Sequence, residues 1–589
     1  MWPYSSYPES KPQEVANHTY DYIIVGGGTA GCCLAARLTE NPNTSVLVIE
    51  RGRIGDTWLS KVPLVSANLY AKDAFCAIFD SEPVANANAR KLDTIIGEGL
   101  GGGSRVNSCV YTRGVADYNK WKSMGHSDWG YDELEPIFAK SEHTLTKSES
   151  RFRGKSGPWI NQTIYDFPFK CHTFVYQAAE RLGLPHISDI NSPDEPAYGI
   201  ATMDITTNAS GQRQSTMHAF LPQHVAASRK SRLYICSNTL VSKLDITTAP
   251  GKKPRVTGVS FHHVKNHSGQ IFQAVATKEV ILCAGAIANP QILMLSGIGP
   301  KDHLTKFNIS VVKDMPGVGS YLGDHCGVPT SWEVPVDDSL HVLYNKPTRV
   351  LLDLIRYITS GKGLLSVPFL QSSIFIKTSL LNEKSELIKS DKSHLDARQP
   401  SNIPDIEIMP SHHRATAKAV DPVLDKIGIF TLNTTLVQPM SRGSVRLASA
   451  NPMDRPLVEL GFLSHAKDLV TLRKGLRLSL KLANQMTVEG CPLKPVASQL
   501  PDSESEESLD KYIRENIRSC LHYTSTCRMA PEEDPTSPGV VDDELRVHGV
   551  DGLRIADTSI FPDIISTHTM AVAVVVAEKC ALLIQTKSM

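Results

Sequence analysis

The pattern of hydrophobic positions predicts a βαβ unit over residues 20–50. An apolar run ends at Val25, a glycine-rich turn and a helical stretch follow, and a second apolar run covers residues 45–49. The turn has the spacing Gly-x-Gly-x-x-Gly, with glycines at Gly26, Gly28 and Gly31. Glycines at these positions permit a tight turn and let a pyrophosphate approach the helix N-terminus. The unit therefore indicates a dinucleotide site.

Hydrophobic patterns farther along the chain predict other elements. Residues 403–409 alternate as a half-buried strand does, and residues 439–445 indicate a turn into a strand. Residues 552–562 predict a short strand that ends at Asp557. The apolar run 570–577 is far shorter than the ~20 residues that span a bilayer, so we expect a buried helix.

Charge is balanced along the chain, whose 589 residues include 61 basic and 61 acidic ones without a long run of one sign. This balance gives no reason to expect nucleic acid or a membrane as a partner. Residues 1–19 are predicted as an N-terminal arm without a core of its own. The most polar tracts are expected to be loops or exposed helices, and they cover residues 147–155, 384–392 and 502–511.

The twelve cysteines form no Cys-x-x-Cys pair and no Cys/His set with zinc spacing, so we predict no metal site. Cys527 is expected to be an inert buried thiol. Seven N-glycosylation sequons are present, yet no charged segment followed by an apolar run marks a signal peptide. We therefore favour an intracellular location, with secretion of a processed form as the alternative.

Glu50 directly follows the second apolar run of the βαβ unit. Its carboxylate can accept hydrogen bonds from both hydroxyls of a ribose, and its charge repels a ribose 2′-phosphate. The residue therefore argues against NADP, but the unit alone does not distinguish FAD from NAD.

Further segments do distinguish them. Between Gly99 and Ser104 the chain has almost no side chains, so its backbone can lie against a flat ring or a phosphate. It lies within the run Gly-Glu-Gly-Leu-Gly-Gly-Gly-Ser-Arg-Val-Asn at residues 97–107. Three more segments follow it in order, at residues 285–300, at residues 316–325, and in a C-terminal block from His522 through Asp557 to His568. Together they resemble the glucose-methanol-choline (GMC) oxidoreductases along almost the whole chain, most closely the fungal aryl-alcohol oxidase-like members.

The resemblance implies a mixed α/β (α+β) fold. A Rossmann-like FAD-binding domain would be interleaved with a substrate-binding domain of antiparallel sheet backed by helices. We assign residues 20–128, 231–327 and 540–589 to the first domain, and residues 129–230 and 328–539 to the second. The second domain would roof a pocket over the flavin.

FAD is the cofactor that the resemblance implies. Some relatives attach FAD through a histidine where this chain has Asn107, so we expect non-covalent binding. The residues expected to contact the cofactor are Gly26, Gly28, Thr29, Ala30, Gly31, Glu50, Gly99, Gly102, Gly103, Ser104, Asn107, Ser108, Cys109, Val110, Val241, Ala284, Asp557, Thr569 and Met570.

Several positions depart from the family pattern. Glu98 stands where a basic residue is usual, Asn289 where Ser or Thr is usual, and Ser525 where Gly is usual. Leu521 and Ser108 occupy positions that are aromatic in aryl-alcohol oxidases. Without those rings the pocket should stack aryl substrates less well, which argues against naming the chain an aryl-alcohol oxidase.

Two histidines carry the chemistry that the resemblance implies. His522 would be the general base, and His568 would orient the substrate hydroxyl; with Leu521 they would line the substrate pocket. An imidazole suits this role because its ordinary pKa of about 6.5 lies near neutral pH. His325 is expected to have a structural role. The pair at residues 412–413 is expected in a solvated loop, with the pocket entrance as the alternative.

These features predict FAD-dependent oxidation of a small-molecule alcohol to an aldehyde or ketone. Hydride would pass to the flavin and dioxygen would be reduced to hydrogen peroxide. A dehydrogenase that uses a quinone or other acceptor, a hydroxynitrile lyase and a light-driven decarboxylase remain alternatives on the same scaffold. The sequence leaves the alcohol and the oligomeric state open.

Overall fold

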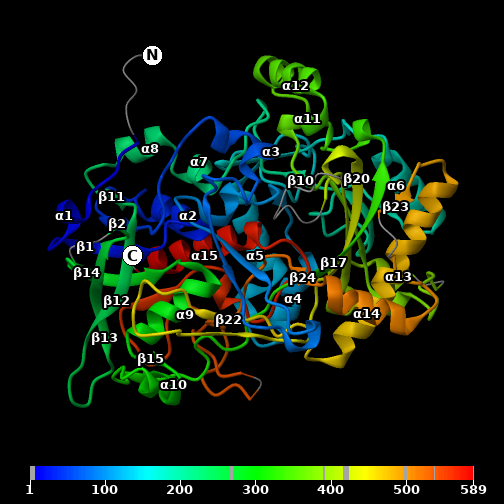
Figure 1. Ribbon diagram of the computed structural model, residues 1–589. Helices are drawn as coiled ribbons and strands as arrows, with labels where there is room; N and C mark the ends of the chain where they lie inside the picture. The colour runs from blue at the N-terminus through cyan, green and yellow to red at the C-terminus, as the bar shows by residue number, and fades with distance from the viewer. Residues whose placement is uncertain are drawn as a thin grey trace.

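The computed structural model describes residues 7–265, 269–388, 392–414, 424–496, 500–535 and 537–587. A first sheet gathers strands from distant parts of the chain (Figure 1). Its centre is β1 (Thr19–Val25), which pairs in parallel with β2 (Val46–Ile49) and with β14 (Phe272–Leu282). The strand order is β11-β2-β1-β14-β13-β12, and β25 also pairs with β14. The outer strands are β11 (Leu233–Cys236), β12 (Thr239–Thr247), β13 (Arg255–His263) and β25 (Leu553–Ile555).

The predicted βαβ unit is present, since α2 (Thr29–Leu38) connects β1 to β2. Helix α2 packs against α15 (Met570–Lys587), which crosses the interior in red in Figure 1. The predicted buried helix is thus confirmed, and it continues beyond the apolar run. The reason is that Glu578 is buried in an ion pair with Arg37, with 2.7 Å between Oε1 and Nη2. Among the helices described, none has both the length and the apolar character needed to cross a bilayer.

A second sheet, with order β23-β17-β20-β19-β18-β9-β8, lies across the molecule from the first. Its central strands are antiparallel, and α13 (Ala466–Val488) packs on β19 and β20 with α6 (Cys171–Arg181) and α14 (Glu506–Asn516) beside it. The strand predicted at 403–409 is β19, shifted towards the C-terminus. The strands of this sheet are β8 (His186–Ile187), β9 (Gly199–Thr202), β17 (Cys326–Val334), β18 (Ser372–Ile376), β19 (Ile406–Ser411), β20 (Gly428–Leu436) and β23 (Lys494–Pro495), with β24 (Arg518–Ser519) paired to β17.

Smaller sheets and helices complete the fold. The strand predicted after residue 439 is β21, and it pairs with β22. The strands are β3 (Cys76–Asp80) with β4 (Asp93–Gly97), β5 (Val110–Tyr111) with β10 (Asp204–Ile205), β7 (Trp159–Thr163) and β6 (Glu142–Thr144), β15 (Ile298–Gly299) with β16 (Lys313–Asp314), and β21 (Ser444–Arg446) with β22 (Leu457–Glu459). The helices are α1 (Pro12–Val15), α3 (Pro63–Ser66), α4 (Val115–Ser123), α5 (Tyr131–Ser141), α7 (Thr216–Phe220), α8 (Gln223–Ser228), α9 (Gly285–Leu295), α10 (Lys301–Lys306), α11 (Val342–Asn345) and α12 (Pro347–Ser360).

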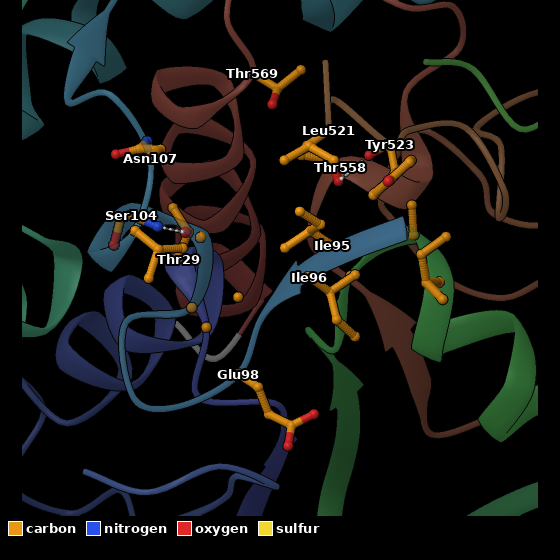
Figure 2. Close-up of a pocket in the computed structure, with 18 of the residues that line it drawn as sticks. Thr29, Ile95, Ile96, Glu98, Ser104, Asn107, Leu521, Tyr523, Thr558 and Thr569 are labelled. Atoms are coloured by element: carbon orange, nitrogen blue, oxygen red, sulfur yellow. Dashed lines mark hydrogen bonds between the residues drawn. The ribbon is translucent and has the colours of Figure 1, made fainter. Parts of the chain in front are cut away.

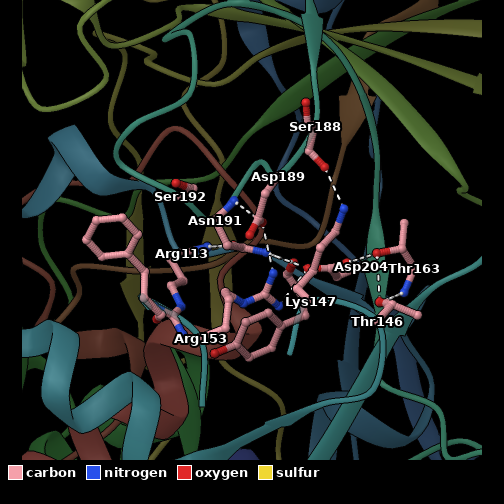
Figure 3. Close-up of polar contacts among 12 residues, drawn as sticks. Arg113, Thr146, Lys147, Arg153, Thr163, Ser188, Asp189, Asn191, Ser192 and Asp204 are labelled. Carbon is pink, nitrogen blue, oxygen red and sulfur yellow. Dashed lines mark hydrogen bonds and ion pairs between the residues drawn. The ribbon is translucent and has the colours of Figure 1, made fainter. Parts of the chain in front are cut away.

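One polar tract contains a buried residue that its composition did not indicate. Arg153 is only 3% exposed, and its guanidinium pairs with Asp189 at 2.8 Å, as Figure 3 shows, and with Glu142 at 2.6 Å. Glu142 also pairs with Arg113 at 2.6 Å. Burial disfavours the charge on Glu142, but the two guanidinium groups outweigh it and lower the pKa of Glu142 to about 2. This cluster fixes the chain just after the glycine-rich segment, and so helps to position it.

The other polar tracts are as expected where they are described. Residues 502–511 include the exposed first turn of α14, whereas residues 389–391 of the tract 384–392 lie outside the described residues. From residue 7 onward the N-terminal arm lies on the first sheet, with the Ser10 N–H donating to the carbonyl of Ile235 at 2.8 Å. The domain boundaries at residues 128, 230, 327 and 539 stay a prediction.

Candidate functional site

A cavity of about 630 Å³ lies between the two large sheets. Figure 2 shows β4 passing along it, with Thr569 at the start of α15 and Leu521 close by. Most of the predicted site residues line this cavity. They are Gly26, Gly28, Thr29, Ala30, Glu50, Gly102, Gly103, Ser104, Asn107, Ser108, Val110, Val241, Ala284, Asp557, Thr569, Met570, Leu521, His522 and His568. Gly31, Gly99 and Cys109 are not among the residues that line it.

The two glycine-rich segments meet at one side of the cavity. The Cα of Gly28 would lie 2.8 Å from a Cβ added at Gly102, so the close approach requires glycine. The hydroxyl of Thr29 accepts a hydrogen bond of 3.2 Å from the N–H of Ser104, as Figure 2 shows. The two loops therefore present adjacent backbone to the cavity, which is the surface that a pyrophosphate requires.

Gly31 acts from behind this surface, because a Cβ there would lie 2.0 Å from the carbonyl oxygen of Gly26. Because Gly31 has no side chain, α2 can pack closely on the turn. Cys109 lies beneath the cavity wall, fully buried and with a φ of 60°. Its N–H donates to the side-chain oxygen of Asn107 at 3.0 Å, which leaves Asn107 facing the cavity. Both residues support the site without lining it.

Glu50 joins the two loops, a role that sequence reasoning missed. Its carboxylate accepts from the N–H groups of Gly27, at 2.8 Å, and Gly99, at 3.1 Å. Burial raises the pKa of Glu50, although these backbone N–H groups act in the opposite direction. Glu50 lines the cavity, and with a third hydrogen bond from the N–H of Gly52 at 2.8 Å its carboxylate keeps about one free lone pair, so binding of ribose hydroxyls by Glu50 stays a prediction.

Asp557 is likewise engaged with the protein. Its carboxylate accepts from the N–H of Gly285 at 2.7 Å and from the amide of Asn289 at 2.8 Å. Asn289, which departs from the family pattern, also accepts from the N–H of Ala284 at 2.9 Å and so links Asp557 to the chain just before α9. The bonds hold the N-terminus of α9 at the cavity. Asp557 therefore presents its backbone more readily than its carboxylate to a cofactor.

The structure brings His522 and His568 together, although they are far apart in sequence. Their ring centroids lie 5.0 Å apart with an interplanar angle of 86°, and both rings line the cavity. Burial lowers the pKa of His522 well below its ordinary value, and the neighbouring His325 and His568 lower it further. His522 is therefore neutral at neutral pH, as a proton acceptor must be.

Glu407 on β19 is a site residue that sequence reasoning missed. Its carboxylate oxygen lies 3.1 Å from Nε2 of His568 and accepts from the Ser373 hydroxyl at 2.7 Å. Burial raises the pKa of Glu407, but its contacts with His568 and the hydrogen bond from Ser373 act in the opposite direction, and the pKa is lowered overall. The signal in the sequence was a single acidic residue between Ile406 and Ile408.

His325 contacts the predicted base directly, so its structural role belongs to the site. Its Nδ1 lies 2.8 Å from Nδ1 of His522, and its Nε2 lies 2.8 Å from the carbonyl oxygen of Ile565. Next to it, the Asp324 carboxylate accepts from the backbone N–H of His522 at 2.8 Å. His522 is thus held at both its backbone and its ring.

The expectation that residues 412–413 form a solvated loop is wrong. His412 is 5% exposed, and its Nδ1 lies 3.2 Å from the carbonyl oxygen of Asp338. His413 lines the cavity beside Phe369, with ring centroids 4.5 Å apart. The Leu340 N–H, at 2.8 Å, and the Ser339 hydroxyl, at 3.0 Å, donate to the carbonyl of His412 and hold the chain there after β19. His413 thus lies at the pocket, and a position at the pocket entrance, the alternative expected from the sequence, stays a prediction.

Comparison with known proteins agrees with this geometry. Residues 20–327 and 439–577 each match a family model described as GMC oxidoreductase. The oxygen-dependent choline dehydrogenase 1 of Chromohalobacter salexigens is 31% identical over 95% of this chain and 94% of its own length. The FAD- and quinone-dependent glucose dehydrogenase of Drosophila pseudoobscura is 31% identical over 97% of this chain and 87% of its own. The formate oxidase of Aspergillus oryzae superposes with a TM-score of 0.83 and 25% identity over 97% of this chain and 99% of its own.

Proposed function

We propose, since this chain belongs to the GMC oxidoreductase family, that it oxidises an uncharged alcohol with dioxygen as the acceptor and His522 as the base. The cofactor is FAD, and the substrate carries a CH–OH group, as in the family. The observation that carries the proposal is the pair of rings, His522 and His568, 5.0 Å apart on the cavity wall.

The cavity fits FAD on the geometry of its glycine-rich wall. Backbone from the turn at Gly28 and from the loop at Gly102 would hold the pyrophosphate, and Glu50 would hold the ribose. Asn107 stands near α15 with its amide 2.8 Å from the sulfur of Met570, and it offers no imidazole for attachment. We propose non-covalent binding on that ground. When bound, FAD would supply the acceptor for the hydride of the carbinol carbon.

His522 and His568 would divide the work on the substrate hydroxyl. His522 is neutral and faces the cavity, so it can take the hydroxyl proton as hydride leaves. Because Glu407 is ionised, it accepts a hydrogen bond from Nε2–H of His568. His568 is thereby held with Nδ1 available for the hydroxyl. The negative charge of Glu407 would also offset the positive charge that develops on His522.

The second-sheet side of the cavity favours an alcohol with an apolar body. Among the described residues, those that line this side include Phe369, Leu370, Met409, Ser411, His413, Arg414, Asn433, Arg518 and Ser519. None of these is acidic, so none of them offers a carboxylate to a quaternary ammonium group such as that of choline. We therefore propose an uncharged aliphatic or aromatic alcohol over a cationic one.

The acceptor is the less constrained part of the proposal. One relative is described as oxygen-dependent and another as using FAD and quinone. We propose dioxygen because a positive imidazole next to reduced flavin stabilises the anion that forms when oxygen takes an electron. A quinone-dependent dehydrogenase is the second candidate.

The test follows the flavin absorbance of the purified protein. A panel of uncharged alcohols, with choline as the matched cationic control, is added without air, and air is then admitted. Bleaching by an uncharged alcohol, followed by recovery with one peroxide per flavin, is expected. Recovery only with an added quinone would support the dehydrogenase, and bleaching by choline alone would contradict the substrate class. A flavin that no alcohol reduces would contradict the proposed oxidation.

A further inference from the structure

The hydrogen bond between His325 and His522 needs a single proton, because it joins two ring nitrogens. The two Nδ1 atoms lie 2.8 Å apart, and one must donate while the other accepts. The second ring nitrogen of His325, Nε2, determines which of the two Nδ1 atoms donates. There Nε2 lies 2.8 Å from the carbonyl oxygen of Ile565, which can only accept. His325 therefore carries a proton on Nε2.

The protonation state of His325 then fixes the state of its neighbour. His325 is fully buried, and burial lowers its pKa to about 4, so the ring is neutral at neutral pH. A neutral imidazole has one N–H, which in His325 is already placed on Nε2. Nδ1 of His325 must accept, so Nδ1 of His522 must donate. Since His522 is also neutral, its Nε2 is left without a proton.

We infer that His325 is a positioning residue that locks His522 in the tautomer whose bare Nε2 takes the proton of the alcohol. The inference rests on the proposed function, in which His522 is the base. The alcohol loses its hydroxyl proton to Nε2 of His522, and the carbinol hydrogen leaves with two electrons to FAD. A carbonyl product and a protonated His522 result, so charge and electrons balance.

Backbone pairing holds the two histidines, His325 and His522, at a fixed position relative to each other. Cys326, directly after His325, pairs with Ser519 on β24, and the N–H of Cys520 donates to the His325 carbonyl at 2.9 Å. His522 follows two residues later, with its own N–H bound to Asp324 at 2.8 Å. The separation of the two rings is therefore set by strand pairing. A shift of one residue in that pairing would remove the contact.

Two variants of His325 that have similar shapes, one with and one without a hydrogen-bond acceptor at the position of Nδ1, test whether that acceptor matters. His325→Asn keeps an oxygen at the position of Nδ1, whereas His325→Leu has no acceptor there. Both lose the bond to Ile565, so a purely structural role of that bond would affect both equally. In His325→Leu the buried N–H of His522 loses its partner, which favours the other tautomer and removes the base from the cavity.

The measurement is the rate constant of flavin reduction without air at saturating alcohol, together with the alcohol dissociation constant, FAD content and melting temperature. We expect His325→Leu to reduce flavin about tenfold to hundredfold more slowly than His325→Asn, at equal alcohol affinity and FAD content. Equal rate constants in the two variants would overturn the inference. His522→Ala serves as the reference for the proposed function: if it reduces flavin normally, the proposed function fails first.

Neutron diffraction from deuterated crystals of the unchanged holoenzyme gives a second readout that needs no variant. Deuterium is expected on Nε2 of His325 and on Nδ1 of His522, with none on Nε2 of His522. Deuterium on Nδ1 of His325 would overturn the inference, even if both variants fold poorly.

Discussion

Two groups of histidines in this molecule have different surroundings, although burial lowers the pKa of members of both, His325 and His522 in one and His172 and His412 in the other. The cavity histidines are His325, His522 and His568, and the stacked histidines are His172 and His412. In the first group the hydrogen bonds run to a backbone carbonyl and to the ionised Glu407. In the second, Phe167 and Phe169 stack on the rings at 3.8 and 4.5 Å between centroids. Only the first group contains rings that line the cavity.

This difference shows what a low histidine pKa means. Burial, with a contribution from the neighbouring His413, lowers the pKa of His412 to about 3, although no acid pairs with its ring. His172 even has an Nε2 without a hydrogen-bond partner among the described residues. A depressed pKa therefore marks burial, and catalysis requires in addition an exposed lone pair and a chain of oriented partners.

The largest expected effect comes from removing His522, the proposed base. His522→Ala should lower the rate constant of anaerobic flavin reduction by at least about 10²-fold, since general-base catalysis contributes that much. FAD content should stay unchanged, because His522 is not among the residues that form the glycine-rich wall. His412→Asn, in the stacked group, is the control and should change the rate by less than about twofold. Near-normal reduction in His522→Ala would remove His522 from the mechanism.

A smaller effect on flavin reduction is expected from changing Glu407, the acid that the cavity histidines have and the stacked histidines lack. Glu407→Gln keeps a hydrogen-bond acceptor for His568 but removes the buried negative charge. We expect flavin reduction to slow about tenfold, because the positive charge that develops on His522 loses its counter-charge. Ser373→Ala is the matched control, since it removes one hydrogen bond and leaves the charge. If both variants slow the rate equally, the charge of Glu407 has no special part.

The contrast also shows what could be predicted from the sequence. The glycine positions could be predicted from the sequence because each meets a backbone requirement within one turn or loop. His522 and His568 were readable only through the family resemblance, since no periodicity relates them. The fold and the FAD cofactor were likewise predicted from the family resemblance.

Contacts between distant segments were not readable. Glu407 stands in an alternating strand like any polar residue, and its partner follows 161 positions later. Arg153 lies in a polar tract, yet acids from several other segments bury it. Ser525 replaces the usual glycine at a φ of 69°, which shows that its backbone conformation is kept without glycine. Each case depends on tertiary pairing, which pattern alone does not fix.

The stacked histidines should affect stability in acid. His412 is neutral when folded, with a pKa of about 3, and its ordinary pKa near 6.5 returns on unfolding. The unfolded state therefore binds more protons below about pH 6.5, and the free energy of unfolding falls as the pH falls. His412→Asn, which keeps a donor for the Asp338 carbonyl, should reduce this slope by at most about 1.4 kcal/mol per pH unit. Urea unfolding at several pH values measures it, and an unchanged slope would contradict the assignment.

The smallest expected change is in the pH dependence of flavin reduction. Because the pKa of His522 lies well below 6.5, the base stays neutral, and the rate constant should change less than about twofold between about pH 8 and pH 6. An unperturbed histidine would lose about fourfold over the same range. Asp324 is the group to control, since burial raises its pKa to about 7 and it contacts the His522 backbone. A fourfold fall that persists in Asp324→Asn would show that His522 titrates like a solvated histidine, and the distinction between a neutral cavity base and an ordinary one would be lost.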